Sequence, residues 1–134
     1  MKLNESSLEM VTSVRSSVSS RKTDLQDRVT ALVEMLGGQV VVEGDYPAWE
    51  YKAQSELRET VCETYRKLFG EEPVFEAIHA GLECGLFSEK YPGIDMISFG
   101  PTLRGVHSPD EALLIPTVEK VWKHMVDILE NIPE

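Results

Sequence analysis

The first 46 residues alternate between the apolar period of a strand and that of a helix. Residues 8–17 (LEMVTSVRSS) alternate apolar and polar side chains, and this pattern predicts a half-buried strand. Thr23 and Gln26 have the spacing of a capping box, which predicts a helix from Thr23 to the glycine pair 37–38. Residues 39–43 (QVVVE) predict a second strand. The expected buried face of the helix consists of Leu25, Val29, Leu32, Val33 and Leu36.

The rest of the chain predicts three more helices and two short strands. The helices are expected over residues 55–69, over residues 82–90 and from Pro116 onward, since proline suits a first helical turn. The short apolar segments 74–80 and 95–99 predict strands. Strands that alternate with helices indicate an α/β fold with a parallel component.

Two of these helices have an apolar face that is expected to be buried. In the helix over residues 55–69 the face consists of Leu57, Val61, Tyr65, Leu68 and Phe69. In the helix from Pro116 it consists of Val118, Val121, Trp122, Met125, Ile128, Leu129 and Ile132. His124 interrupts the second stripe and is predicted to lie at the surface.

The composition is that of a folded globular protein with an acidic balance. The 134 residues include 13 Lys+Arg and 23 Asp+Glu, for a net charge of -10, and 42% are hydrophobic. Phosphate binding needs clustered basic side chains, so the scattered Lys and Arg exclude nucleic acid and an anionic membrane as partners. No apolar stretch approaches the roughly 20 residues of a membrane span, and residues 1–7 lack a signal-peptide core. The expected compartment is the cytoplasm.

The two cysteines, Cys62 and Cys84, both lie in predicted helices. Each is expected to be a small buried hydrophobic residue, with a disulfide as the alternative. A small enzyme that pairs one of these thiols with a histidine is a further alternative, which an activated thiolate would reveal.

Two loops after predicted strands carry the candidate chemistry, residues 79–85 and residues 99–111. The second loop contains His107, with Asp110 and Glu111 close behind. A neutral imidazole there can bind zinc, act as a base or hold the loop. Zinc takes several protein ligands, so His107 alone does not make a metal site.

A long run of the sequence resembles a known family. Residues 79–111 (HAGLECGLFSEKYPGIDMISFGPTLRGVHSPDE) resemble the C-terminal signature of aminoacyl-histidine dipeptidases, which are cytosolic zinc metallopeptidases of the M20 class that hydrolyse Xaa-His dipeptides. Residues 14–17 (VRSS) resemble the family's RSS strand, and residues 46–49 (YPAW) resemble its YPGW stretch. The resemblance implies a β-α-β piece of a ferredoxin-like lid domain over residues 1–46 and the C-terminal α/β part of the catalytic domain over residues 47–134.

The resemblance also implies two site residues. His107 matches the family's last metal ligand, in a site that holds two zinc ions, and Asp110 and Glu111 are expected to orient its loop. Arg15 matches the lid arginine that holds the terminal carboxylate of the substrate, for which a guanidinium fork is well suited. A solvated strand residue is the alternative for Arg15.

Three further residues are possible cleft residues in the same resemblance: His79, Glu83 and Gly100. Neither His79 nor Glu83 receives a role, and packing or loop capping is an equal alternative for both. Gly100 and Gly105 are expected to permit close backbone approach to a ligand.

The other parts of such a site have no counterpart in this sequence. The family's H-x-D motif, bridging Asp and further Asp are not found, and the Glu71–Glu72 pair sits before Pro73 at a helix exit and is not taken as the family's Glu pair with the general base. Metal-assisted hydrolysis needs both metals and the base together. We therefore expect part of a zinc dipeptidase whose isolated 134-residue chain has no peptidase activity. The alternative is a stand-alone, non-catalytic α/β module that pairs with a partner chain or with itself. Exposed strand edges favour a homo-oligomer.

Overall fold

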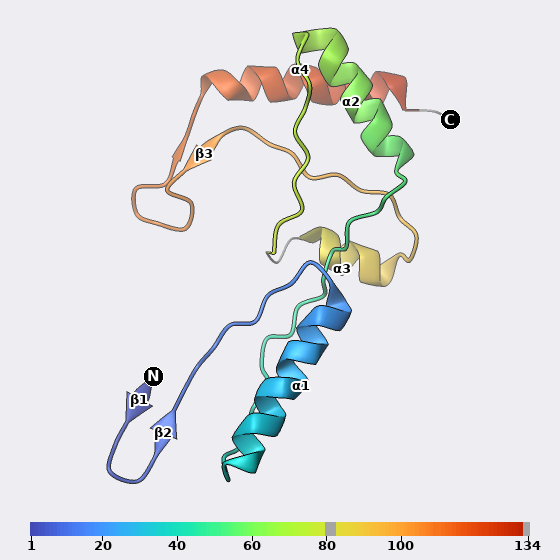
Figure 1. Ribbon diagram of the computed structural model, residues 1–134. Coiled ribbons are helices and arrows are strands. Elements are labelled where there is room, and N and C mark those ends of the chain that lie inside the picture. Colours follow the sequence, from blue (N-terminus) through green and yellow to red (C-terminus); the bar gives the residue numbers. More distant parts are fainter. Residues whose placement is uncertain (80–82, 133–134) are drawn as a thin grey trace. The chain divides into compact units, whose positions relative to one another are not determined.

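The computed structural model describes residues 1–79 and 83–132 (Figure 1). The chain divides into two compact units. The first unit comprises Met1–Tyr51 and Ala77–Lys90, and the second comprises Lys52–Glu76 and Tyr91–Glu134. Each unit thus combines two stretches that are distant in the sequence. The division into residues 1–46 and 47–134 that the resemblance implies stays a prediction.

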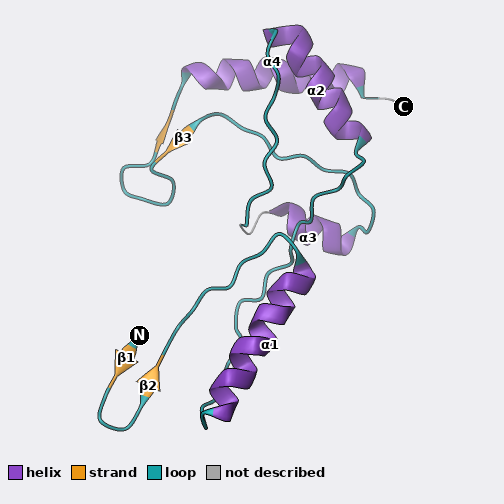
Figure 2. Ribbon diagram, in the orientation of Figure 1, coloured by secondary structure: helices purple, strands orange, loops and turns teal. Residues whose placement is uncertain are grey.

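The first unit holds a short hairpin and two helices. Strands β1 (Lys2–Leu3) and β2 (Leu8–Glu9) form an antiparallel pair. Helix α1 covers Ser19–Met35 and helix α3 covers Glu83–Lys90. Outside these elements, the described residues of the first unit form loops and turns (Figure 2). The prediction of a helix over residues 82–90 is confirmed from Glu83 onward, and Leu82 lies outside the described residues.

Of the two strands predicted on either side of α1, the first is much shorter than predicted and the second does not form. Of residues 8–17, only Leu8 and Glu9 form a strand, and residues 39–43 form none. A strand needs a neighbour that accepts and donates its backbone hydrogen bonds. No strand among the described residues pairs with residues 39–43, so this apolar run is present without a sheet.

Helix α1 begins four residues before the predicted capping box. The Thr23 hydroxyl donates to the carbonyl of Ser19 inside the helix, so Thr23 is not the N-cap. The amide of Ser19 instead donates to Glu50 Oε1 at 2.8 Å. A carboxylate at this end also suits the partial positive charge of the helix N-terminus. The capping-box prediction is therefore wrong, because a residue from a distant loop caps the helix.

The predicted buried face of α1 lies in solvent. Four of its five members are exposed, namely Leu25, Val29, Leu32 and Leu36. The buried residue of α1 is Lys22. The end of the helix is as expected, since Gly37 adopts a φ of +81° and the amide of Gly38 donates to the carbonyl of Val33 at 2.9 Å.

Helix α3 packs its only glycine, Gly85, against the loop that follows residue 45. A Cβ placed on Gly85 would lie 2.5 Å from the backbone carbonyl oxygen of Pro47. The close approach of helix and loop therefore requires glycine at this position.

Replacing Gly85 by alanine is expected to destabilise the protein by about 1–3 kcal/mol, because the Pro47 backbone must move. At an ordinary helix position the same change would stabilise by roughly 1 kcal/mol, so the sign is diagnostic. Urea unfolding followed by circular dichroism measures it. Gly100→Ala is the matched control, since a Cβ there meets no atom within 4 Å. Equal stability of both variants would contradict the packing argument.

The second unit holds two crossing helices and a hairpin. Helices α2 (Glu56–Phe69) and α4 (Pro116–Asn131) lie side by side (Figure 1). Strands β3 (Leu103–Arg104) and β4 (Ala112–Leu113) pair antiparallel. The predictions of helices over residues 55–69 and from Pro116 are confirmed.

Both ends of α2 follow from its sequence. The Ser55 hydroxyl accepts the amide of Arg58 at 3.0 Å, which makes Ser55 the N-cap. Gly70 ends the helix in the left-handed conformation with a φ of +66°. A second acceptor at the N-terminus of α2 comes from a residue distant in the sequence. Asp95 Oδ2 accepts the amide hydrogen of Leu57 at 3.2 Å.

The Asp95 carboxylate gives the second unit a pH dependence. Burial alone would raise the pKa of Asp95, but the hydrogen bonds from Ser55 and Leu57 and the charge of Lys52 outweigh it and lower the pKa. A carboxyl whose pKa is lower in the folded chain than in the unfolded chain, where it is about 3.9, stabilises the fold at pH values above about 3.9. This stabilisation is lost as the pH falls through the folded-state pKa.

Asp95→Asn is therefore expected to destabilise the chain at pH 6 by about 1 kcal/mol, the usual value of a lost charged cap. At pH 3 the stability difference between the two proteins should be smaller, because Asp95 of the unfolded wild type, with a pKa of about 3.9, is then largely protonated and the advantage of the folded carboxylate shrinks. Urea unfolding at both pH values measures it. A stability difference between wild type and Asp95→Asn that is larger at pH 3 than at pH 6 would contradict the capping role of the Asp95 carboxylate.

The core of the second unit lies between α2 and α4. Val61, Thr64, His124 and Ile128 are buried there, and His124 is only 5% exposed. The prediction that His124 lies at the surface is wrong. Its Nε2 lies 3.1 Å from both the Thr64 hydroxyl and the Val61 carbonyl, and the rings of Tyr65, Phe69 and Phe99 surround it. The Thr64 hydroxyl already donates to the Thr60 carbonyl, so Nε2 is the donor.

Part of the predicted apolar stripe of α4 faces solvent. Trp122 is 62% exposed and Leu129 is 65% exposed, and Val118 and Ile132 are also exposed. Only Ile128 of the predicted stripe is fully buried. The inward face instead runs through His124, and the outward apolar face has no cover within the described residues.

The remaining predicted strands do not form. Residues 74–79 and 95–99 are loops, and Ala80, the last residue of the first of these strands, lies outside the described residues. Both hairpins are antiparallel, so the expected parallel component is not seen in the described part of the chain. The fold is mixed α/β, with four helices and two small sheets in that part. None of these helices combines the length and apolar character that a membrane span requires.

Candidate functional site

The β3–β4 hairpin presents His107 at its tip. Leu103 pairs with Leu113 and Arg104 with Ala112, and residues 105–111 form the loop between them. Gly105 adopts a φ of +58°, and a Cβ there would lie 3.0 Å from the Ser108 hydroxyl. The Ser108 hydroxyl donates to the Gly105 carbonyl at 2.6 Å. Gly105 is therefore required by the turn, whereas Gly100 has an ordinary φ and an open Cβ position.

His107 has an unusual backbone conformation. Its φ is +63°, and it is the only non-glycine residue with positive φ among the described residues. For an L-residue this conformation costs roughly 1 kcal/mol, although histidine tolerates it better than most. The side chain is exposed, and its ring makes no hydrogen bond within the described residues. A strained residue with a free ring is a feature of functional sites.

Glu111 holds the backbone of His107 in this conformation. The amide of His107 donates to Glu111 Oε2 at 2.8 Å, and the amide of Glu111 donates to the Ser108 carbonyl at 3.1 Å. The expectation that Glu111 orients the loop is thus confirmed. Asp110 takes part through its amide, which donates to the Ser108 hydroxyl at 3.3 Å.

The described residues do not form a zinc site by themselves. No group of three or more His, Cys, Asp or Glu side chains among them is placed to hold a metal ion. His107 offers one imidazole, and a zinc ion needs more protein ligands than that. A zinc ion at His107 would therefore need ligands from outside the described residues.

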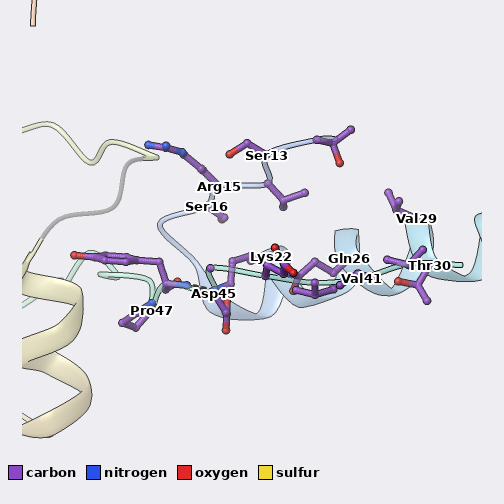
Figure 3. A pocket seen from close by; sticks show the side chains of 17 residues that line it. Ser13, Arg15, Ser16, Lys22, Gln26, Val29, Thr30, Val41, Asp45 and Pro47 are labelled. Atoms are coloured by element: carbon purple, nitrogen blue, oxygen red, sulfur yellow. Dashed lines mark hydrogen bonds and ion pairs between the residues drawn. The ribbon is translucent and has the colours of Figure 1, made fainter. Parts of the chain in front are cut away.

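Arg15 borders a cavity of about 470 Å³ in the first unit. The walls are residues 12–16, one side of α1 and residues 40–47. Figure 3 shows Arg15 and Pro47 at one end of the cavity and Val29 and Thr30 at the other. Arg15 is exposed, and its guanidinium has no ion pair within the described residues.

A second cation in this cavity, Lys22, is already paired. Its Nζ lies 2.6 Å from Asp45 Oδ1 and 2.6 Å from the Tyr46 carbonyl oxygen, and its side chain is 11% exposed. The hydrogen bond from Lys22, followed by its charge, lowers the pKa of Asp45. Lys22 is thus committed to structure, and Arg15 is the cation that remains available to an anionic ligand in this cavity.

Sequence reasoning missed the Lys22–Asp45 pair. The sequence pattern placed Lys22 before the helix, whereas α1 begins at Ser19 and carries Lys22 in its first turn. Only the early helix start brings Lys22 to Asp45, so no local sequence signal marked the pair.

The predicted site residues fall in both units. Arg15, His79 and Glu83 belong to the first unit, and His107 and Gly100 belong to the second. His79 Nδ1 accepts the amide of Ser17, two residues after Arg15, at 3.0 Å. Glu83 is the exposed first residue of α3.

The cysteines do not support a thiol enzyme. Cys62 and Cys84 are both free and half-buried, so the disulfide alternative is wrong. Burial raises the pKa of Cys84, and the neighbouring carboxylate of Glu83 adds to the rise. A raised pKa keeps the Cys84 thiol protonated, which is the opposite of an activated nucleophile.

Comparisons with known proteins find one peptidase family and two similar dipeptidases. A family model described as "Peptidase family M20/M25/M40" matches residues 7–131. The "Cytosol non-specific dipeptidase" of Escherichia coli (strain K12) is 38% identical over 131 residues, which is 98% of this chain and 27% of that protein. The crystal structure of aminoacylhistidine dipeptidase from Vibrio alginolyticus matches with a TM-score of 0.76 and 43% identity, over 89% of this chain and 24% of the other. The chain therefore spans about a quarter of the length of these relatives.

Proposed function

The chain belongs to peptidase family M20/M25/M40, and from this premise we propose that it supplies one metal ligand and one substrate-binding arginine to a zinc-dependent dipeptidase. His107 is the metal ligand and Arg15 binds the terminal carboxylate of the dipeptide. The other metal ligands and the general base come from polypeptide outside this chain. The observation that carries the proposal is the conformation of His107, whose strained backbone is fixed by Glu111 while its ring stays free.

The geometry of Arg15 supports the second role. Its guanidinium borders a cavity and is unpaired within the described residues, while the neighbouring Lys22 is neutralised by Asp45. A guanidinium binds a carboxylate through two parallel charged hydrogen bonds, which a single ammonium cannot offer. Arg15 is therefore suited to the carboxylate that every dipeptide carries at its C-terminal end.

The exposed apolar faces support a site shared with further polypeptide. The outer face of α4 exposes Trp122 and Leu129, and α1 exposes Leu25, Leu32 and Leu36. Apolar surface of this extent is normally covered in a folded protein. Because the chain spans about a quarter of its relatives' length, the remaining three quarters of such an enzyme are the cover that we propose.

For the substrate we propose Xaa-His dipeptides, hydrolysed in the cytoplasm. The name of the Vibrio alginolyticus relative, an aminoacylhistidine dipeptidase, supports this preference. The Escherichia coli relative is named a non-specific dipeptidase of the cytosol, which supports a wider range and the same compartment. Comparing the rates of hydrolysis of β-alanyl-histidine and of a dipeptide without histidine distinguishes a preference for Xaa-His dipeptides from a wider substrate range.

The test is a chimera in which this chain replaces the 131 residues of the Escherichia coli dipeptidase that it matches. We expect the purified chimera to release histidine from β-alanyl-histidine only when zinc is present. The isolated 134-residue chain is the matched control, and we expect no release from it with or without zinc. A folded chimera without activity, or an active isolated chain, would contradict the proposal.

A second candidate function is a stand-alone, non-catalytic module that pairs with itself or with another chain. The exposed apolar faces of α1 and α4 favour it to the same degree as they favour a larger enzyme. Sedimentation of the isolated chain and the activity of the chimera together distinguish the stand-alone module from the part of a larger enzyme. A stable homo-oligomer of the isolated chain beside an inactive chimera would favour the module.

A further inference from the structure

His79 is joined to the segment that carries Arg15, although 62 residues separate it from Ser17. Its Nδ1 lies 3.0 Å from the backbone nitrogen of Ser17 and 3.3 Å from the Ser17 hydroxyl. Ser17 is buried, whereas His79 is an exposed residue. Both residues belong to the first unit, so the contact lies within one compact body.

Three side chains fix the three consecutive amides that follow Arg15 and Ser16. His79 accepts the amide of Ser17, the Ser16 hydroxyl accepts that of Val18 at 3.0 Å, and Glu50 accepts that of Ser19 at 2.8 Å. Side-chain acceptors thereby hold all three amides from Ser17 to Ser19, where the chain enters α1. Of the three acceptors, only the His79 ring comes from residues 77–90.

The hydrogen bond also determines which nitrogen of His79 carries the proton. The Ser17 amide can only donate, so Nδ1 must accept with its lone pair. The imidazole is then neutral, with its proton on Nε2. The ring therefore contacts Ser17 through Nδ1, while Nε2 has no hydrogen-bond partner within the described residues.

We propose that His79 is a positioning residue for Arg15, acting through the Nδ1 hydrogen bond to Ser17. This inference rests on the proposed function, in which Arg15 binds the dipeptide carboxylate. The Arg15 side chain has no partner within the described residues, so the placement of its guanidinium depends on the backbone from which it starts. Two-pronged recognition of a carboxylate tolerates little misplacement. His79 supplies the constraint nearest to Arg15 from outside the segment itself.

Two matched variants separate this role from a direct substrate contact. Asparagine at position 79 places its amide group near Nδ1 and can still accept from Ser17, whereas glutamine places its amide near Nε2. We expect His79→Ala to raise KM of the chimera about tenfold with little change in kcat. His79→Asn should restore KM to near wild type, and His79→Gln should behave like alanine.

A double-mutant cycle tests the link to Arg15. If His79 acts through Arg15, His79→Ala should add nothing in the Arg15→Ala background. An equal tenfold rise in that background would overturn the proposal. Rescue by glutamine and not by asparagine would also overturn it, because that pattern indicates that Nε2 touches the substrate directly.

Nuclear magnetic resonance on the isolated chain tests the same inference without any activity. The ¹⁵N shifts of His79 should report the Nε2–H form, and His79→Ala should lower the order parameter of the Arg15 amide while His79→Asn preserves it. An unchanged Arg15 order parameter in His79→Ala would overturn the proposal. An inactive wild-type chimera beside the expected spectra would count against the proposed function, while the part of the inference that has His79 hold the backbone at Arg15 would remain supported.

Discussion

His107→Ala is expected to lower kcat of the chimera at least about 100-fold, because the change removes a proposed ligand of the metal on which hydrolysis depends. Bound zinc, measured by atomic absorption, should fall with it. The backbone of residue 107 complicates the alanine variant, since a φ of +63° is strained for any L-residue.

His107→Gly separates loss of the ring from collapse of the loop. Glycine adopts positive φ freely, so the Glu111 contact and the hairpin should persist, and stability should rise by about 0.5–1 kcal/mol. Activity should be as low as in His107→Ala. If His107→Gly retained activity, the imidazole would have no role in the reaction and the proposed ligand would be wrong.

Arg15→Ala is expected to lower kcat/KM of the chimera about 100-fold, mainly through KM, because two charged hydrogen bonds to the substrate carboxylate are lost. Arg15→Lys should lie between wild type and alanine, since an ammonium keeps the charge but not the fork. Steady-state kinetics with β-alanyl-histidine measure both.

Arg21→Ala is the charge-matched control for Arg15. Arg21 is exposed on α1 and does not line the cavity, so the variant removes the same charge from the same unit. We expect its kcat/KM to stay within about twofold of wild type, as is usual for a screened surface charge. An equal loss in both variants would show that net charge, and not carboxylate binding by Arg15, determines the affinity.

The helices were predictable because their signals are local. Ser55 and Gly70 bound α2, and Pro116 begins α4, as the capping and stop residues indicate. The start of α1 was not predictable in this way, because its cap is Glu50, which lies 31 residues away from Ser19. A distant carboxylate leaves no mark in the local pattern.

The extent of the strands was not predictable, because a strand forms only where a neighbouring strand pairs with its backbone hydrogen-bonding groups. Residues 39–43 and 95–99 have the apolar pattern of sheet segments but find no partner strand in the described part of the chain. About three quarters of each relative lies outside the matched region. Under the proposed function, polypeptide that corresponds to those parts would pair with these segments and cover the apolar face of α1 and the outer face of α4.

His107 and Arg15 come from the motifs of the family resemblance, and their roles stay proposals. The structure adds the positive φ of His107 and the cavity beside Arg15. Helical spacing alone could not place His124, because burial of a histidine depends on polar partners from another helix. The Val61 carbonyl and the Thr64 hydroxyl on α2 provide those partners.

We propose that Glu111 holds His107 in its strained conformation so that the ring can bind metal beside other ligands. A crystal structure of the zinc-loaded chimera with a bound dipeptide analogue would show whether the ring does so. We expect an imidazole nitrogen of His107 at about 2.0–2.1 Å from zinc, with the residue still at positive φ. A fully occupied zinc site from which the His107 ring points away would contradict the account.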